Sequence, residues 1–291
     1  AALVFYLAGL NPFESLLRAM VTISSSGGSS FYAFIYYDNP ALELAAFAVM
    51  LLSSLSLLLV WKAWKLKNLL MLLRDTELQF FLLVLFGAAT LLFLSLSGSG
   101  LYQPGEALKV GFYQVLAFMS TSGLAVTPFW GWPGFEKCVL FMLCFAGGCM
   151  ASPTGGLKMV RVLVLNRLLN LGMKNALHPN MVPVVKLDGL AVEEKVVGRI
   201  LSFFFLYVVT FGLFALLLSL SGLNLLQSAG YAAACLTSTS SAALLYGGPG
   251  AALLPGWSQL LMALLMIIGR IEVFSFILLA GFALEALKEH W

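Results

Sequence analysis

The segment Ala117-Phe-Met-Ser-Thr-Ser-Gly123 places a polar turn directly after a short apolar run. The same design occurs in Ala19-Met-Val-Thr-Ile-Ser-Ser-Ser-Gly-Gly28 and in Ala234-Cys-Leu-Thr-Ser-Thr-Ser240. Polar backbone at membrane depth is tolerated only where protein buries it or where it lines a water-filled path. In a chain built for lipid, three such turns therefore predict a pathway for an ion or another solute.

The composition indicates an integral membrane protein. Of the 291 residues, 61% are hydrophobic and 10% are charged, whereas a soluble domain carries charge on about a quarter of its residues. The formal net charge is +3, and the basic residues are scattered between apolar stretches, which argues against binding of nucleic acid. Four cysteines without a C-x-x-C spacing indicate small buried side chains rather than metal ligands or disulfides.

Five apolar runs are long enough to cross a bilayer, since about 20 helical residues span its core. They cover residues 41–61, 78–98, 135–165, 197–221 and 255–287. Shorter runs of about half that length, which is typical of re-entrant pore helices, cover 12–23, 107–119 and 224–236. Lys and Arg concentrate after the first full span and around 166–196, so we expect these loops to be cytoplasmic and the polar turns to enter from the outer face.

These segments predict an all-α membrane fold built as a tandem repeat of span, short helix, polar turn and span. The second turn lies 96 residues after the first, and the third lies 117 residues after the second, a larger step that the longer cytoplasmic connection explains. A long spacing of this kind marks a duplicated unit. The predicted units are 1–65, 66–168 and 169–291, the last beginning with the cytoplasmic connection. The apolar stub at 1–10 reaches half the bilayer core, so we expect a truncated first unit with earlier sequence missing; a cleaved signal peptide is the alternative.

Three stretches carry a resemblance to a known family. They are Phe118-Met-Ser-Thr-Ser-Gly-Leu124, Gly147-Gly-Cys-Met-Ala-Ser-Pro-Thr-Gly-Gly-Leu-Lys-Met-Val-Arg161 and Gly269-Arg-Ile-Glu-Val-Phe274. With them the chain resembles the ion-translocating membrane subunit of the Trk/Ktr/HKT superfamily of potassium transporters, and within it the Trk type. The resemblance implies a pore of four repeats around a pseudo-fourfold axis, of which this chain holds the end of repeat 2 and repeats 3 and 4, with repeat 1 absent.

The resemblance also implies partners and a location. It implies uptake of K⁺ across the cytoplasmic (inner) membrane by a multi-pass protein and assembly as a homodimer. A cytoplasmic ring of nucleotide-binding regulatory subunits would dock near 62–75 and 166–196. The chain itself has no Gly-x-x-x-x-Gly-Lys-Ser/Thr phosphate loop, so we expect it to bind no nucleotide or other cofactor of its own.

The candidate selectivity filter comprises four residues in each turn. A K⁺ ion must exchange its water for protein oxygens, which backbone carbonyls and Ser/Thr hydroxyls supply without a fixed charge. The candidate K⁺-binding residues are Ser24, Ser25, Ser26, Gly27, Ser120, Thr121, Ser122, Gly123, Thr237, Ser238, Thr239 and Ser240. The alternative is that these side chains cap helices or bond to their own helix carbonyls.

Ser240 departs from the family pattern, which has glycine there. A serine side chain is costly in left-handed backbone, where glycine is not. A sodium-permeable variant of the same pore is therefore an alternative to strict potassium selectivity.

The candidate gate lies inside the long span 135–165. Its small or helix-breaking residues are Gly147, Gly148, Pro153, Gly155 and Gly156, and they predict an unwound stretch. The resemblance identifies this stretch as an intramembrane loop below the filter that opens and closes the pore. A simple kink and close helix packing are the alternatives.

Arg270 and Glu272 lie in the apolar run 255–287. Ionisable groups there are expensive and face a pathway or a partner. The two residues do not share a helix face, so we expect separate partners rather than an ion pair with each other. The resemblance places Arg270 near the pore, as an electrostatic barrier that works with the gate loop.

Two other function classes remain to be distinguished from a pore. A secondary transporter with broken helices would explain the glycine-rich interruption and Arg270 as an anion anchor, but it does not require three matched turns. A membrane-embedded enzyme or a transition-metal site would need a His, Cys, Asp or Glu constellation that the spans lack. Convergence of the three turns on one axis is the observation that favours a pore.

Overall fold

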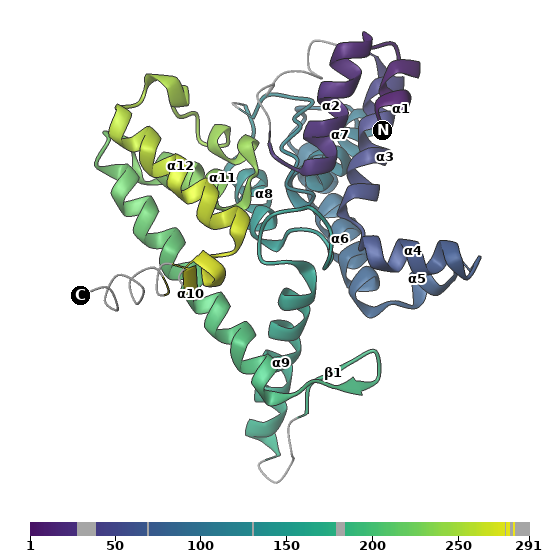
Figure 1. The fold of residues 1–291 in the computed structure, drawn as a ribbon. Helices are drawn as coiled ribbons and strands as arrows, with labels where there is room; N and C mark the ends of the chain where they lie inside the picture. Colours follow the sequence, from purple (N-terminus) through teal and green to yellow (C-terminus); the bar gives the residue numbers. More distant parts are fainter. Residues whose placement is uncertain are drawn as a thin grey trace.

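The computed structural model describes residues 1–27, 39–68, 70–129, 131–178, 184–276, 278–279 and 282, so Gly28 lies outside the described residues. The described elements are helices with one small hairpin (Figure 1). The helices are α1 (Ala2–Leu7), α2 (Pro12–Ser24), α3 (Pro40–Ser54), α4 (Leu57–Lys65), α5 (Leu70–Arg74), α6 (Thr76–Gly98), α7 (Pro104–Met119), α8 (Gly134–Ala146), α9 (Met159–Leu177), α10 (Glu194–Ser219), α11 (Leu225–Thr237) and α12 (Gly256–Ile271). The 3-10 turns η1 (Ser240–Leu244) and η2 (Ala251–Leu253) follow α11, and the strands β1 (Lys186–Leu187) and β2 (Leu190–Ala191) pair antiparallel.

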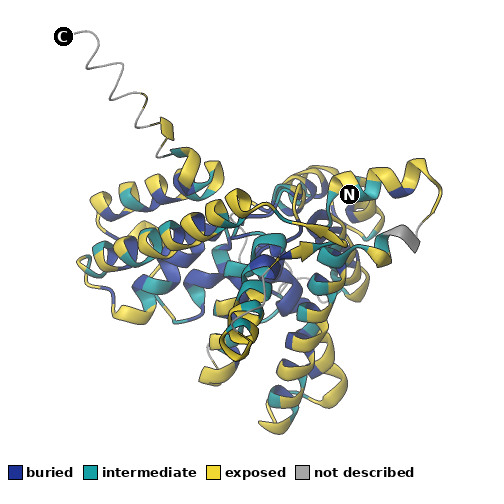
Figure 2. Ribbon diagram, turned by 90° about the horizontal axis from the view of Figure 1, so that it is seen from below, coloured by how far each residue is buried: buried dark blue, intermediate teal, exposed yellow. Residues whose placement is uncertain are grey.

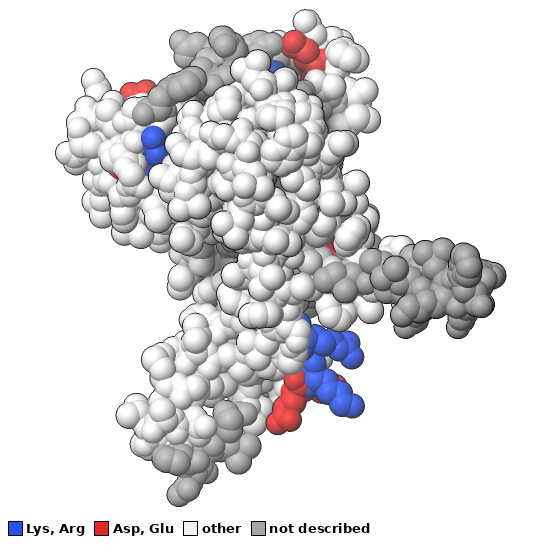
Figure 3. Space-filling view, turned by 90° about the vertical axis from the view of Figure 1, so that its left-hand side faces the viewer, with Lys and Arg blue, Asp and Glu red and all other residues white. Residues whose placement is uncertain are grey.

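Within the described part of the chain, two helices have the length and apolar character needed to cross a membrane. They are α6, with 23 residues, and α10, with 26, and both agree with the spans predicted at 78–98 and 197–221. Their outer faces expose large apolar side chains such as Leu83, Leu94, Phe205 and Leu216. The face shown in Figure 3 carries few charged side chains, and most of them gather in one group on its lower half. This surface suits a lipid environment.

The span predicted at 41–61 consists of two helices rather than one. Helix α3 ends at Ser54, α4 begins at Leu57, and the two axes differ by 92°. The hydroxyl of Ser54 donates to the carbonyl of Met50 (2.7 Å), a side-chain bond that competes with helix continuation and bends helices. Ser56 then accepts a hydrogen bond from the amide of Leu59 (3.5 Å) and caps α4. Helices α4 and α5 consequently project sideways from the bundle (Figure 1).

The last predicted span is interrupted rather than shortened, because residues 273–276 are helical again after a break. Helix α12 ends at Ile271, and Glu272 has a φ of 70°, which interrupts the helix. The interruption predicted inside 135–165 is present, because residues 147–158 separate α8 from α9.

Each of the three short helices enters and returns on the same side. In the first, the side-chain amide of Asn39, just before α3, donates to the carbonyl of Ala8, just before α2 (2.9 Å). In the second, the indole of Trp132, just before α8, donates to the hydroxyl of Tyr102, just before α7 (3.3 Å). In the third, Gln227 of α11 donates to the carbonyl of Gly247 (3.3 Å). The polar turns are therefore re-entrant.

The starts of the short helices explain their positions in the sequence. Helices α2 and α7 begin with proline, whose fixed φ suits the first turn, and each carries a glutamate there that complements the helix dipole. Helix α11 begins with a capping box, in which the side chains of Asn224 and Gln227 bond to each other's backbone amides. Each helix thus has a local start signal.

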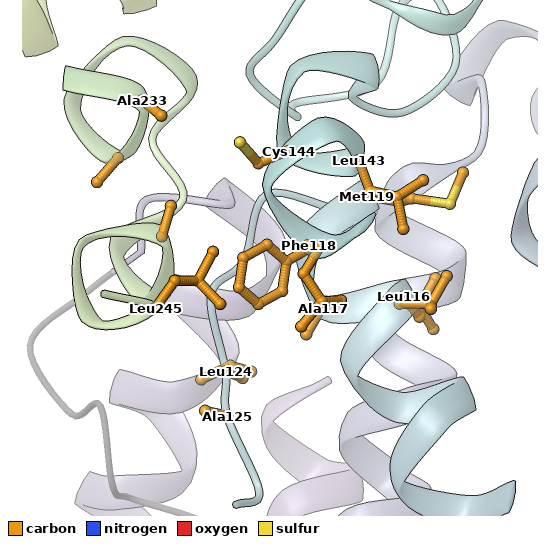
Figure 4. Packing of buried hydrophobic residues seen from close by; sticks show 14 of the residues in the cluster. Leu116, Ala117, Phe118, Met119, Leu124, Ala125, Leu143, Cys144, Ala233 and Leu245 are labelled. Atoms are coloured by element: carbon orange, nitrogen blue, oxygen red, sulfur yellow. The ribbon is translucent and has the colours of Figure 1, made fainter. Parts of the chain in front are cut away.

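Phe118, at the end of α7, is central to the buried core. Its side chain is fully buried, and its ring packs edge-on against that of Phe129 with 5.7 Å between centroids. Figure 4 shows Phe118 between α8, which contributes Cys144, and Leu245 of the returning segment. Seen from below, the buried residues collect toward the middle of the molecule (Figure 2). Membrane helices associate through close packing of this kind, which here fixes the turn that begins at Ser120.

Candidate functional site

The three polar turns share a backbone design. Ser25, Thr121 and Ser238 follow the short helices with φ values of 47°, 53° and 62°, in the left-handed region. Gly27 and Gly123 follow two residues later with φ values of 63° and 65°. Left-handed residues end a helix by redirecting its last carbonyls, so the first two turns repeat the same pair of left-handed positions.

The turns converge. A Cβ atom added at Gly27 would lie 2.6 Å from the carbonyl oxygen of Ser238 and 2.9 Å from the amide of Ser240. A Cβ atom added at Gly123 would lie 2.7 Å from the Oγ of Ser240 and 3.0 Å from its amide. The first and second turns therefore both touch the third at Ser240, and glycine is required at both contacts because a side chain has no room.

The strain expected at Ser240 is absent. Ser238 has a positive φ, but Ser240 is not among the positive-φ residues. Instead the chain at Ser240 turns into the 3-10 segment η1. The third turn thus accommodates serine by changing its backbone path, and the prediction of a costly left-handed serine is wrong.

Several turn hydroxyls bond to carbonyls of the short helix that precedes them. Thr237 donates to the carbonyl of Ala233 (2.8 Å), and Ser120 donates to that of Ala117 (3.3 Å). Similarly, Ser24 donates to the carbonyl of Val21 (3.4 Å). For these side chains the alternative of bonding to the helix's own carbonyls describes the structure, which leaves the backbone carbonyls as the main candidate ligands.

Two buried hydroxyls in or next to the turns have no such bond. The Oγ atoms of Ser25 and Ser241 are buried and have no hydrogen-bond partner among the described residues. A buried hydroxyl without a partner is costly, so both are available to an ion or a water molecule. Ser241 was not predicted from the sequence; its place directly after the Ser/Thr run was the signal.

The short helices also shape the local electric field. Helices α2, α7 and α11 end at the turns, so the carbonyl ends of all three point at the place where the turns meet. The C-terminal end of a helix carries about half a negative charge. No Asp or Glu lies in the turns 24–27, 120–123 and 237–240. This arrangement favours a cation without holding it by a formal charge.

The predicted gate loop, residues 147–158, lies against the turns. The amide of Gly155 donates to the hydroxyl of Thr121 (2.8 Å), and a Cβ atom at Gly155 would overlap the carbonyl of Thr237. On its other side, the amide of Cys149 donates to the carbonyl of Ser54 at the α3–α4 bend (2.9 Å). The loop therefore connects the second turn, the third turn and the broken helix.

Glycines and one lysine shape the loop itself. Gly147 and Gly156 have φ values of 71° and 77°, and a Cβ atom at Gly156 would lie 3.0 Å from the carbonyl of Phe145. The ammonium group of Lys158 donates to the carbonyls of Ser152 (2.8 Å) and Thr154. Lys158 closes the loop from within, which the sequence did not identify although the residue follows the glycine-rich stretch directly.

Arg270 and Glu272 have separate partners, as predicted. The guanidinium of Arg270 donates to the carbonyl of Pro153 in the loop (2.9 Å) and to that of Ser24 in the first turn (3.0 Å). Glu272 forms an ion pair with Arg161 of α9 (2.9 Å). Arg270 thus joins the predicted gate to the predicted filter.

Two cavities meet at Arg270. A cavity of about 550 Å³ lies beside the turns, and its lining includes Ser26, Gly27, Ser238, Ser240 and Arg270. A second cavity of about 230 Å³ lies on the loop side, with Pro153, Lys158 and Arg270 in its lining. Among the described residues no group of three His, Cys, Asp or Glu could hold a metal ion.

The amino-acid sequence matches a known family over most of its length. Residues 6–288 match the family described as "TrkH: Cation transport protein". The chain belongs to the TrkH family. Its membrane character and helical fold follow from this membership and from the helices described above.

Curated TrkH relatives and a solved structure support the assignment. The chain is 29% identical over 286 residues to the Trk system potassium uptake protein TrkH of Halomonas elongata, covering 96% of this chain and 58% of the relative. It is 30% identical over 287 residues to TrkG of Escherichia coli, covering 97% and 59%. The crystal structure of the potassium transporter TrkH from Vibrio parahaemolyticus matches with a TM-score of 0.86 and 27% identity, over 96% of this chain and 60% of the other. The chain thus spans about three fifths of the length of these relatives.

Proposed function

We propose that this chain forms most of a pore for potassium uptake across the cytoplasmic membrane, with a carbonyl-lined filter and an intramembrane gate. The observation that carries the proposal is the convergence of three re-entrant turns at Ser240, each at the carbonyl end of a short helix. The curated relatives are named potassium uptake proteins, which supports K⁺ as the transported ion.

In this mechanism the ion loses its water at the turns. Backbone carbonyls replace the hydration shell, and the helix dipoles stabilise the cation. Below the turns, Arg270 repels the ion while its guanidinium holds the loop carbonyl of Pro153. Movement of the loop, with release of Arg270, would open the path to the cytoplasmic side.

A secondary transporter is the less favoured function. Its broken helices would also account for Arg270 and the loop, but not for the contacts of Gly27 and Gly123 with the same serine. A sodium-permeable variant of the pore is favoured by one observation, the different backbone path of the third turn at Ser240.

The proposed pore has four repeats. This chain supplies the end of repeat 2 in residues 1–65, repeat 3 in 66–168, and the connection with repeat 4 in 169–291; repeat 1 lies outside these residues. The 550 Å³ cavity supports this division, because it lies between the first turn and α11–α12, where repeat 1 of the proposed ring would pack. The share of the relatives that the chain covers supports it as well.

The proposed partners are a second copy of the transporter and cytoplasmic nucleotide-binding regulatory subunits. The regulatory subunits would dock on residues 62–75 and 166–196. Helices α4 and α5 and the end of α9 with the hairpin project away from the bundle and are accessible (Figure 1). Any nucleotide would act through these subunits.

Ion flux tests the proposal directly. The transporter that contains this chain should take up ⁸⁶Rb⁺ into proteoliposomes, and unlabelled K⁺ should compete. An empty-vesicle preparation and the Gly123→Ala variant serve as controls. Transport of an organic solute without any cation flux would contradict the proposal.

A further inference from the structure

Glu77 lies where the gate loop meets the long helix α6. It is in the first turn of α6. Its Oε1 atom accepts hydrogen bonds from the amides of Met150 (2.5 Å) and Val160 (3.1 Å). Met150 lies within the loop, and Val160 lies in the first turn of α9 just after it. One carboxylate oxygen therefore binds both the loop and the start of the helix that follows it.

The amide of Val160 depends on this carboxylate. The first backbone amides of a helix have no partner within the helix, and the positive end of the helix dipole favours an anion there. Glu77 supplies both the acceptor and the charge to α9, although it belongs to a different helix. Charge-assisted bonds of this kind are stronger than neutral ones.

The start of α6 is also bound by the β1–β2 hairpin. Asp188, at the tip of the β1–β2 hairpin, accepts hydrogen bonds from the amide (3.2 Å) and the hydroxyl of Thr76. Asp188 and Gly189 have φ values of 47° and 80°, which form the tight hairpin turn. Thr76 directly precedes Glu77, so the hairpin and the gate loop share one anchor on α6.

We propose that Glu77 is a positioning residue of the gate, which holds the loop in its closed place, and that the hairpin is coupled to the loop through Thr76. The proposal rests on the proposed function, since it assigns a gate role to the loop. Opening must break the bonds of Glu77 to Met150 and Val160, so their strength sets how much of the closed state is populated. A partner protein that displaces the hairpin would weaken the hydrogen bonds that Thr76 and Glu77 make at the start of α6.

Amide hydrogen exchange tests the anchor independently of any transported ion. In the transporter containing this chain, reconstituted in nanodiscs, Glu77→Ala should speed exchange at Met150 and Val160 about tenfold, corresponding to about 1.4 kcal/mol. Glu77→Gln keeps an acceptor oxygen and should cause a smaller increase. Glu194→Ala is the matched control, because Glu194 is also acidic and in the first turn of a spanning helix, and it should change neither amide.

Flux measured in parallel tests the gate role. Basal ⁸⁶Rb⁺ flux should rise in the order wild type, Glu77→Gln, Glu77→Ala. Unchanged exchange in Glu77→Ala would overturn the anchor, and faster exchange with wild-type flux would reduce Glu77 to a structural residue and overturn its positioning role. Faster exchange in a protein that carries no cation at all would uphold the anchor but contradict the proposed function.

The hairpin has its own pair of variants. Asp188→Gly removes the acceptor but suits the left-handed turn, whereas Asp188→Asn keeps both an acceptor and the turn. We expect Asp188→Gly to speed exchange at Val160 about threefold and Asp188→Asn to leave it near wild type. Equal exchange in the two variants would overturn the coupling through Thr76.

Discussion

Gly123 and Ser240 meet where the second and third turns touch, and a single methyl group there should stop transport. Gly123→Ala places a Cβ atom 2.7 Å from the Oγ of Ser240 in backbone with a φ of 65°. Left-handed backbone costs a non-glycine residue about 1–2 kcal/mol, and overpacking adds about 1–3 kcal/mol. We expect ⁸⁶Rb⁺ uptake to fall more than tenfold, measured at equal amounts of reconstituted protein.

Gly100 separates backbone strain from the lack of space. It has a φ of 71°, and nothing lies within 4 Å of a Cβ atom added there. Gly100→Ala therefore introduces the same backbone strain as Gly123→Ala but no steric clash, and it should keep most of the uptake. Equal losses in the two variants would show that the contact with Ser240 does not matter.

Ser240 itself tests whether the third turn sets selectivity. Ser240→Gly allows the turn to adopt the left-handed backbone that Gly27 and Gly123 have, and we expect it to raise the preference for K⁺ over Na⁺ about fivefold, equivalent to about 1 kcal/mol. Ser240→Ala removes only the hydroxyl and disfavours that backbone, so its ratio should stay near wild type. The ratio is measured from competing Na⁺ and K⁺ fluxes. If neither substitution changes it, Ser240 has no part in selectivity.

At the scale of single residues, the sequence predicted where polar side chains would gather but not how they are used. The Ser/Thr turns are in place, yet Thr237 and Ser120 bond to their own helices. The sequence did not indicate that Glu77 binds the gate loop, because an acidic residue in the first turn of a helix is common. Its bonds to Met150 and Val160 arise only when α6 and the loop pack together.

At the scale of elements, the ion pair between Arg161 and Glu272 joins α9 to the end of α12. The pair has a distance of 2.9 Å, and the Arg161 guanidinium also lies 4.0 Å from the ring centre of Phe203. Glu272 is 43% exposed, so solvent screening limits the interaction to about 0.5–1 kcal/mol. A double-mutant cycle with Arg161→Gln and Glu272→Gln, followed by thermal unfolding in detergent, should give a coupling energy of this size.

Lys109 and Glu43 provide the comparison for that cycle. They join α7 to α3 and share no side chain with the pair of Arg161 and Glu272, so their substitutions should add independently to those of that pair. A coupling of zero for the first pair would mean that Arg161 contributes through Phe203 rather than through Glu272.

The helices differ in how well the sequence predicts where they begin, bend and end. The short helices were predicted to within a few residues, because each apolar run ends at a Ser/Thr turn and starts at proline or a capping box. The bend between α3 and α4 was missed, because the apolar composition continues through Leu55. Only Ser54 and Ser56 gave a sign of it, and serine is common in straight membrane helices. The bend matters for the candidate gate, because the amide of Cys149 in the loop donates to the carbonyl of Ser54 there.

At the scale of the whole molecule, the turns enclose the proposed path incompletely. The first and third turns touch at Ser240, but the 550 Å³ cavity beside them opens between Gly27 and α12. A potassium ion needs oxygen ligands on all sides to replace its water. The three turns alone leave one side to solvent or lipid, which cannot supply a fixed ring of ligands.

Residues 1–291 expressed alone should therefore fail to transport, and a segment supplying the first repeat should restore transport. The segment is taken from a TrkH relative and is produced in the same cells, which lack other potassium uptake systems. We expect growth at low K⁺ and ⁸⁶Rb⁺ uptake only when both parts are present. The matched control pairs the segment with the Gly123→Ala chain, which should assemble but not conduct. Uptake by residues 1–291 alone, at the level of the pair, would contradict the four-repeat ring.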